Sequence, residues 1–318
     1  MKHIFGPVPS RRLGQSLGID PVPLKTCNWN CVYCQLGRSK PMVNKRADYY
    51  PPKAILSEAK EALAGHEPGG IDWVTFVGSG ETTLHASMGW LIRQVKMLTH
   101  LPVAVITNGA LLYCPELRRE LRAADAVLPS LDAGTPALYK QINRPHPSLS
   151  FERLLNGLKL FRREYSGKLW VEVMLLRGLN DTESALRDIA AALETIQPDE
   201  VQIVQPTRPP AEIWVQPPDE EGLLRARAIL GEMVNIVPPA CGDVNRNNSE
   251  TLIDAVAGII TRHPMRAGEL AQTLRKWSEE EIMAALADLE NSGRAKVVER
   301  YGTRFWSASN SHYAESGA

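Results

Sequence analysis

The sequence has few cysteines and no long hydrophobic run. Five cysteines in 318 residues are too few for a disulfide framework, so we expect a reducing, cytoplasmic setting. No apolar stretch approaches the ~20 residues that cross a bilayer. The N-terminus, Met1-Lys2-His3-Ile4-Phe5, lacks the apolar region of a signal peptide. We therefore expect no membrane partner.

The chain also lacks a net charge, with 36 basic and 36 acidic residues. The two signs are nevertheless unevenly distributed, because residues 1–53 carry nine Lys and Arg against only two acids, Asp20 and Asp48. A solvated basic face is the ordinary interpretation. Such a segment would also attract a polyanionic substrate or an acidic electron-donor protein.

The most informative feature is a cysteine run at Cys27, Cys31 and Cys34, with the spacing C-x3-C-x2-C. Three thiolates on one loop can hold three irons of a four-iron cluster. The fourth iron is then open, and an open metal position distinguishes a reactive site from a closed structural one. Zinc with a distant fourth ligand is the alternative, although no histidine lies within the next thirty residues.

Between residues 51 and 236, short apolar segments alternate with amphipathic ones, which is typical of β/α units and a parallel sheet. Strands are expected at 17–19, 71–77, 103–107, 126–128, 169–175 and 201–204. Helices are expected at 54–63, 84–98, 115–121, 151–163, 183–196 and 219–233. This pattern gives six β/α units but does not separate an open doubly wound sheet from a partial barrel.

Polar or glycine-rich segments follow several of these strands, where parallel α/β proteins bind ligands. A plain turn is the competing interpretation for the glycine segment and for Asn108. A lone acid within a buried strand, as at Glu172, is costly unless it is paired. The candidate site residues are Ser79, Gly80, Glu81, Asn108, Ser130, Asp132 and Glu172.

The C-terminal part differs in pattern from the rest. We expect a core domain over 1–236, a linker over 237–249, a second domain over 250–307 and a disordered tail over 308–318. Three helices and a hairpin in the second domain predict a winged-helix module. Its presumed recognition helix begins with Glu279, Glu280 and Glu281, which DNA phosphates would repel. Docking of a substrate, peptide or subunit is therefore favoured over operator binding.

The cysteine run and the segment Gly78-Ser79-Gly80-Glu81 resemble motifs of the radical S-adenosylmethionine (SAM) superfamily. Segments 5–14, 142–146 and 206–212 further resemble a group of Fe–S oxidoreductases related to the wyosine-forming tRNA enzymes. Those enzymes carry additional upstream cysteines for a second cluster, and this chain has none before Cys27. The resemblance implies a partial (β/α)6 barrel, one [4Fe–4S] cluster and SAM.

The resemblance also implies roles for the candidate residues. The three cysteines would hold the cluster, Ser79, Gly80 and Glu81 would bind the SAM ammonium group, and Ser130 and Asp132 would lie at the ribose. Asn108 would lie near the cofactor.

The implied reaction is reductive cleavage of SAM to a 5′-deoxyadenosyl radical, which abstracts hydrogen from a tRNA base, a peptide or a small metabolite. A flavodoxin- or ferredoxin-type protein would donate the electron. The alternative is a metal or Fe–S sensor that uses its winged helix to bind nucleic acid or protein. The intact glycine–glutamate turn favours the enzyme.

Overall fold

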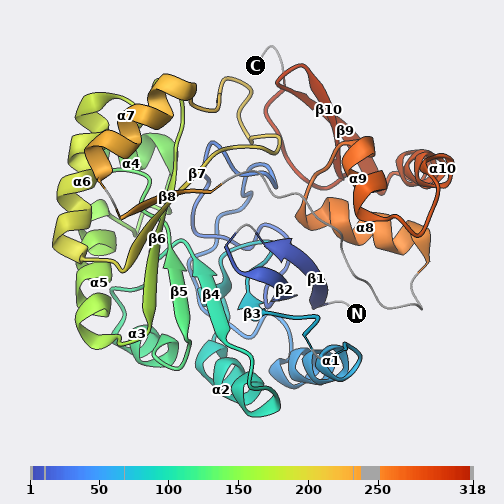
Figure 1. The fold of residues 1–318 in the computed structure, drawn as a ribbon, viewed down its shortest axis with the longest axis horizontal. Helices are drawn as coiled ribbons and strands as arrows, with labels where there is room; N and C mark the ends of the chain where they lie inside the picture. The colour runs from blue at the N-terminus through green and yellow to red at the C-terminus, as the bar shows by residue number, and fades with distance from the viewer. Residues whose placement is uncertain (1–2, 11, 68, 232, 238–250, 316–318) are drawn as a thin grey trace.

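The core is built on one twisted sheet of eight strands within the residues that the computed structural model describes, which are 3–10, 12–67, 69–231, 233–237 and 251–315. The strands lie in the order β1 to β8 (Figure 1). β1 pairs antiparallel with β2, and all later neighbours pair in parallel. Their bounds are β1 Ile4–Ser10, β2 Gly14–Ile19, β3 Trp73–Phe76, β4 Val103–Thr107, β5 Ala126–Pro129, β6 Lys168–Met174, β7 Glu200–Val204 and β8 Val234–Ile236.

The helices of the core lie along the outer side of the sheet, as Figure 1 shows for α1, α2, α3, α5 and α6. Their bounds are α1 Pro52–Ala64, α2 Met88–Leu98, α3 Pro115–Leu121, α4 Pro136–Ile142, α5 Phe151–Glu164, α6 Glu183–Ile196 and α7 Glu220–Leu230, with a 3-10 turn at Thr82–Leu84. Local signals begin several of them: Ser150 and Thr182 cap α5 and α6 through side-chain oxygens.

Alternate strand residues separate the two faces of the sheet. Val74, Val105 and Val171 belong to the main core against the helices, whereas Trp73 and Trp170 belong to a small cluster on the opposite face, as the two-residue period of a strand requires. The sequential strand order is that of a singly wound sheet, so the doubly wound alternative is excluded. It is consistent with the open barrel that the resemblance implies.

All six predicted strands and all six predicted core helices are present. Three elements were missed: β1, α4 and β8. β1 contains Gly6, Pro7 and Pro9, residues that oppose a strand assignment from sequence. β8 is only three residues long and directly follows the range 219–233 assigned to a helix.

The C-terminal unit has its own hydrophobic core. It contains α8 Leu252–Arg262, α9 Ala267–Thr273, α10 Glu279–Asn291 and the antiparallel strands β9 Ala295–Arg300 and β10 Thr303–Ala308. Leu270, Leu286 and Trp306 are buried together in that core. Ser278 and Glu281 form a capping box at the start of α10. Residues 238–249 of the expected linker lie outside the described residues.

The C-terminal tail differs from the sequence prediction. We predict disorder over 308–318, but residues up to 315 that the structure describes pack against the core. The Tyr313 hydroxyl donates to the Gln35 carbonyl at 2.6 Å, the Arg38 amide to the His312 carbonyl at 2.5 Å, and the Ala314 amide to the Ala211 carbonyl at 2.8 Å. Small polar composition indicated disorder, but these long-range backbone contacts supply partners that the composition does not reveal.

Among the described residues, no helix is both long and apolar enough to cross a membrane.

Candidate metal and cofactor site

The cysteine loop connects β2 to α1 and is fixed by backbone hydrogen bonds to the end of α4. The Val32 amide donates to the Ile142 carbonyl at 2.9 Å, and the Asn30 amide to the Asn143 carbonyl at 3.0 Å. Trp29 is 1% exposed and contacts the Tyr139 ring edge-on at a centroid distance of 5.3 Å. Trp29 therefore belongs to the main core.

Nitrogen donors surround the three thiols. Lys25 Nζ lies 3.0 Å from Cys34 Sγ, Asn143 Nδ2 lies 3.7 Å from Cys31 Sγ, and the Trp29 amide lies 3.4 Å from Cys27 Sγ. Donors of this kind stabilise negative charge on sulfur. The loop thus offers three sulfurs together with groups suited to thiolates.

The thiols need strong positive compensation to ionise. Burial raises the pKa of Cys27 to about 12, against the opposing effect of Lys25. Burial, together with the neighbouring Cys27 and Cys34, also raises the pKa of Cys31 well above its usual value. Metal ions supply such compensation, because a coordinating thiol is deprotonated on binding.

The donor set fits an iron–sulfur cluster. Cysteine thiolates are the usual ligands of iron–sulfur clusters, and three of them on one loop can bind three irons and leave a fourth open. Hydrogen bonds to α4 and to the glycine turn fix this loop.

Asp132 organises the loop from the strand side. Its carboxylate accepts hydrogen bonds from Tyr33 Oη at 2.6 Å, Asn143 Nδ2 at 2.6 Å and the Met174 amide at 2.8 Å. Burial raises the pKa of Asp132, and these three donors oppose the rise. Asp132 is 1% exposed, so the geometry makes it an anchor of the cysteine loop.

Glu81 is turned inward. Its carboxylate accepts from the Asn108 amide at 2.7 Å, from Thr107 Oγ1 at 2.5 Å, and from the amide and hydroxyl of Thr83. The side chain of Asn108 continues toward the cysteine loop and donates to Asn28 Oδ1 at 2.7 Å. Glu81 therefore fixes the turn that contains it and joins this turn to the end of β4.

The glycine turn and the cysteine loop are joined directly. The Lys25 amide donates to the Ser79 carbonyl at 2.6 Å, and the Glu81 amide donates to the Thr26 carbonyl at 2.9 Å. A Cβ on Gly80 would lie 2.1 Å from the Thr26 carbonyl oxygen, so the close approach requires glycine. Two motifs about fifty residues apart in sequence thus form one structural unit.

Ser79 has a partner that the sequence did not reveal. Both its amide, at 3.1 Å, and its hydroxyl, at 2.7 Å, donate to Asp20 at the end of β2. Arg262, the last residue of α8, binds the same carboxylate through Nε at 3.0 Å. The C-terminal unit therefore reaches the candidate cofactor turn through a single buried acid.

Glu172 is paired, as expected because an unpaired carboxylate in a buried strand is energetically costly. Its partner is Arg12, which precedes β2. By strand alternation Glu172 lies on the same face of β6 as Trp170, away from the helices. Ser130 is half-buried beside it, since the two residues form a bridge between the ends of their strands. Six of the seven non-cysteine candidates follow strands at one edge of the sheet, and Glu172 lies within β6.

Sequence reasoning missed Asp20, Lys25 and Asn143. Lys25 is two residues from Cys27 and its ammonium reaches Cys34, so its proximity to the run was a usable signal. Asp20 carried none, because its importance depends on a contact 59 residues away. Asn143 lies in segment 142–146, which carried part of the resemblance, but its contact with Cys31, 112 residues away, did not follow from that.

Part of the charge of the basic N-terminal segment is balanced inside the molecule. Arg12 pairs with Glu172, Arg38 with Glu212 and Arg46 with Glu120. Three of the nine cations are thus matched by acids of the core. The segment is therefore weaker evidence for a polyanionic substrate than the sequence indicated.

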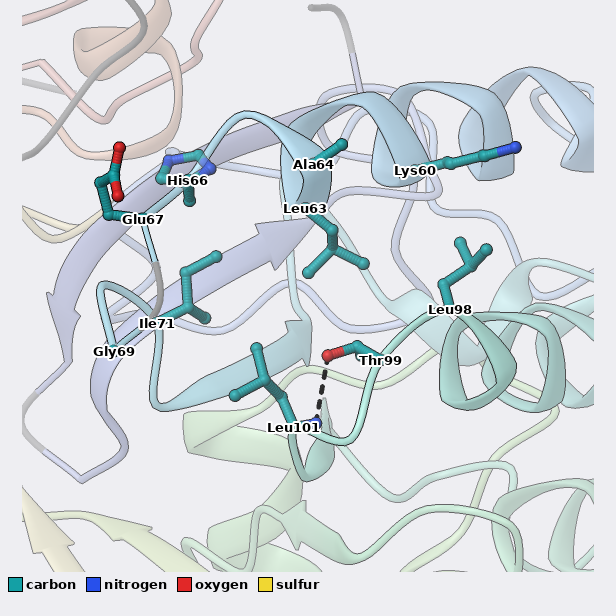
Figure 2. Close-up of a pocket in the computed structure, with 10 residues that line it drawn as sticks. All are labelled: Lys60, Leu63, Ala64, His66, Glu67, Gly69, Ile71, Leu98, Thr99 and Leu101. Atoms are coloured by element: carbon teal, nitrogen blue, oxygen red, sulfur yellow. Dashed lines mark hydrogen bonds between the residues drawn. The ribbon is translucent and has the colours of Figure 1, made fainter.

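A shallow pocket of about 420 Å³ lies at the opposite end of the strands. Figure 2 shows Leu63, Ile71 and Leu101 around it, between the end of α1, the start of β3 and the loop after α2. Ligands of parallel α/β proteins bind at the carboxyl ends of strands, so this pocket is unrelated to the candidate site.

Comparisons with known proteins agree with this geometry. Residues 22–189 match the model of the radical SAM superfamily. A UPF0026 protein of Methanocaldococcus jannaschii is 34% identical over 283 residues, covering 87% of each chain. A protein of Brachyspira hyodysenteriae named GTPase Obg is 38% identical over 93% of this chain, but the match spans only 43% of that protein.

A solved structure gives the same fold. The radical SAM methyltransferase from Sphaerobacter thermophilus superposes with a TM-score of 0.50 at 16% identity, covering 70% of this chain and 65% of that one.

The open α/β sheet with a three-cysteine loop defines a class of cofactor-dependent enzyme. The chain belongs to the radical SAM superfamily. Members are enzymes, and membership implies a [4Fe–4S] cluster and SAM, so the sensor alternative is not favoured.

Proposed function

We propose that Cys27, Cys31 and Cys34 bind one [4Fe–4S] cluster and that the turn Ser79-Gly80-Glu81 binds the amino-acid end of SAM beside it through its backbone, since the Ser79 and Glu81 side chains hold the turn in place. The observation that carries this proposal is the direct hydrogen bonding of the glycine turn to residues 25 and 26. A cofactor held by the turn would therefore lie against the cysteine loop. When bound, the cluster supplies the electron that cleaves SAM to a 5′-deoxyadenosyl radical.

The chain's own residues position these groups and limit access of water. Lys25, Asn143 and the Trp29 amide offset negative charge on the sulfurs, and Asp132 holds Tyr33 and Asn143 in place. Ser130 at the end of β5 is proposed to lie at the ribose. Asp132 is buried and acts through its contacts with the cysteine loop. We therefore assign the ribose contact that the resemblance implies to Ser130 and not to Asp132.

We propose that the substrate is a tRNA base, a peptide or a small metabolite. Because most arginines of the N-terminal segment are paired with core acids, charge alone does not favour RNA. The Arg12–Glu172 pair lies on the inner face of the sheet and provides both a cation and an anion for a polar substrate. We further propose a partial barrel as the scaffold, with residues 1–236 as the catalytic core.

The C-terminal unit has the element order of a winged helix, three helices followed by an antiparallel pair of strands. We propose that it is such a module. We propose that it docks a substrate, peptide or subunit and does not bind DNA, because α10 begins with three glutamates. Arg208 of the core pairs with Glu269 of α9.

Anaerobic reconstitution with iron and sulfide tests the function. Iron and sulfide are counted, the cluster is reduced with dithionite, and SAM is added alone. A change in the electron paramagnetic resonance spectrum reports SAM binding even without turnover, and 5′-deoxyadenosine reports cleavage. The control replaces the three cysteines with alanine. A protein that binds zinc but no cluster would contradict the proposal.

A further inference from the structure

The loop after β7 exposes two large apolar side chains. Ile213 is 39% and Trp214 is 47% exposed, whereas their neighbours Glu212 and Val215 are buried. The buried neighbours fix this part of the loop on the core, so Trp214 is not on a free tip. An exposed tryptophan on a fixed backbone is typical of the central contact residue of a protein interface.

This loop lies directly against the cysteine loop. The Glu212 amide donates to the Val32 carbonyl at 3.0 Å, and Val215 packs with Val32 in a small buried cluster. Val32 stands between Cys31 and Cys34 in the sequence. One hydrogen bond and a few covalent bonds therefore separate the exposed side chains from the proposed cluster ligands.

The surroundings of Trp214 carry excess positive charge. Arg38 and Arg144 both bind Glu212, at 2.7 and 2.5 Å. Burial opposes ionisation of Glu212, but the two arginines hold its pKa below the usual value. Two guanidinium groups thus share one carboxylate, and one positive charge is left over.

One further arginine contacts the loop, but it is paired. The amide of Arg177 donates to the Gln216 carbonyl at 3.0 Å, and its exposed guanidinium forms an ion pair with Asp219 at 3.7 Å, so it adds no net charge. Lys40 and Lys140 are both exposed and lie close in sequence to Arg38 and Arg144. We call Ile213, Trp214, Arg38, Arg144 and Arg177 the Trp214 patch.

We propose that the Trp214 patch is the docking surface for an acidic one-electron donor protein of the flavodoxin or ferredoxin type. This inference rests on the proposed function, because only a cluster in the cysteine loop requires such a donor. One electron leaves the reduced donor and enters the cluster, and no covalent bond forms or breaks. Complementary charge steers the encounter, and Trp214 supplies the apolar contact at its centre.

Single-stranded RNA is the competing occupant, since bases stack on exposed aromatic rings between arginines. The protein donor is favoured because Glu212 already neutralises part of the arginine charge. It is also favoured because the patch lies at the cysteine loop, where reduction takes place.

The test uses the full-length reconstituted chain with a purified flavodoxin and an acidic ferredoxin. Donor binding is titrated directly, and the rate of cluster reduction is followed by absorbance with either the donor or dithionite. Trp214→Ala should weaken donor binding about tenfold or more, as expected for a hot-spot residue, and should leave the dithionite rate unchanged. Arg144→Glu should also weaken binding and reduce its salt dependence.

Met97→Ala is the matched control, because Met97 is 71% exposed on α2, far in sequence from either loop, and should change nothing. Unchanged donor binding in Trp214→Ala, or no binding of either donor by the unaltered chain, would overturn the proposal. Loss of tRNA binding in Trp214→Ala with donor binding intact would assign the patch to RNA instead. Absence of a cluster, or the lack of a spectral change with dithionite and SAM, would contradict the proposed function itself. The binding titration measures docking independently of that function, so the two failures can be told apart.

Discussion

The cysteine loop and the C-terminal unit are fixed in the molecule by different kinds of contact. The loop is held by backbone hydrogen bonds to α4 and to the glycine turn, and by the buried carboxylate of Asp132. The C-terminal unit has a separate core and meets the rest through the pairs Arg262–Asp20 and Arg208–Glu269 and through its tail.

The difference shows where precision is required. Backbone hydrogen bonds in a packed interior cannot change one at a time without leaving buried groups unpaired, so the candidate cofactor site is held in one geometry. Side-chain ion pairs contribute less to stability and tolerate change. The one exception is Arg262, because its pair with Asp20 joins the C-terminal unit to the residue that holds Ser79.

The largest effect is expected at the centre of the first region. Asp132→Ala leaves three buried donors, on Tyr33, Asn143 and Met174, without their acceptor. At 1–3 kcal/mol for each such group, we expect the free energy of unfolding to fall by about 4 kcal/mol, measured by denaturant titration. Iron bound per chain should fall as well. Asp132→Asn retains an acceptor oxygen and should lose less than half as much; equal losses in both variants would show that the charge, not the hydrogen bonds, is what matters.

The second prediction concerns the separate core. Leu286 is fully buried there, and Leu286→Ala should destabilise the C-terminal unit by about 3 kcal/mol through loss of packing and a residual cavity. Limited proteolysis should then cleave within residues 251–315 first, while iron content stays near that of the unaltered chain. A parallel loss of iron would contradict this prediction, because it would mean that the cysteine loop and the C-terminal unit fold as one.

A smaller effect is expected where the regions meet. Arg262→Ala leaves Asp20 buried with only the Ser79 donors, which should cost about 2 kcal/mol. Proteolysis should detect earlier release of the C-terminal unit, with its internal core intact. Asp20→Asn, which removes the charge and keeps a hydrogen-bond acceptor, should release it less. If neither variant differs from the unaltered chain, the other contacts of the unit, among them the Arg208–Glu269 pair and the tail, hold it in place.

The smallest effect is expected at the outer contact. Arg208→Ala should cost about 1 kcal/mol, since both partners are partly exposed. Although burial opposes its ionisation, Glu269 has its pKa lowered by Arg266 and Arg208. This contribution is therefore present above the ordinary glutamate pKa of about 4.3 and is lost as the pH falls below it. Arg187→Ala on the exposed face of α6 is the control and should cost under about 0.5 kcal/mol; an equal loss at Arg208 would show that this contact does not secure the unit.

Much of the fold followed from local sequence. Apolar β-branched runs predicted all six shared strands, and caps such as Ser278 with Glu281 fixed where helices begin. The elements that were missed are short or contain glycine and proline, so their formation depends on neighbours in the sheet and not on their own residues.

The candidate site divides in the same way. The sequence predicts the three cysteines as cluster ligands from their spacing and from the resemblance, because one cluster requires its ligands close together on one loop; that role stays a prediction. The roles of Asp132 and Glu81 could not be predicted, since an acid at a strand end can face a ligand or anchor a loop, and only its contacts decide between them. Likewise, the sequence assigned disorder to a tail whose hydrogen-bond partners lie on residues 35 and 211.

By itself, the sequence predicted the class of cofactor and the order of the β/α units, because both predictions depend on residues close together in the chain. Tertiary structure decided which acids are paired, which arginines keep excess charge beside Trp214, and how the C-terminal unit reaches Asp20. These outcomes depend on distances between groups that are far apart along the chain, and burial makes each unmatched group costly enough to determine its partner.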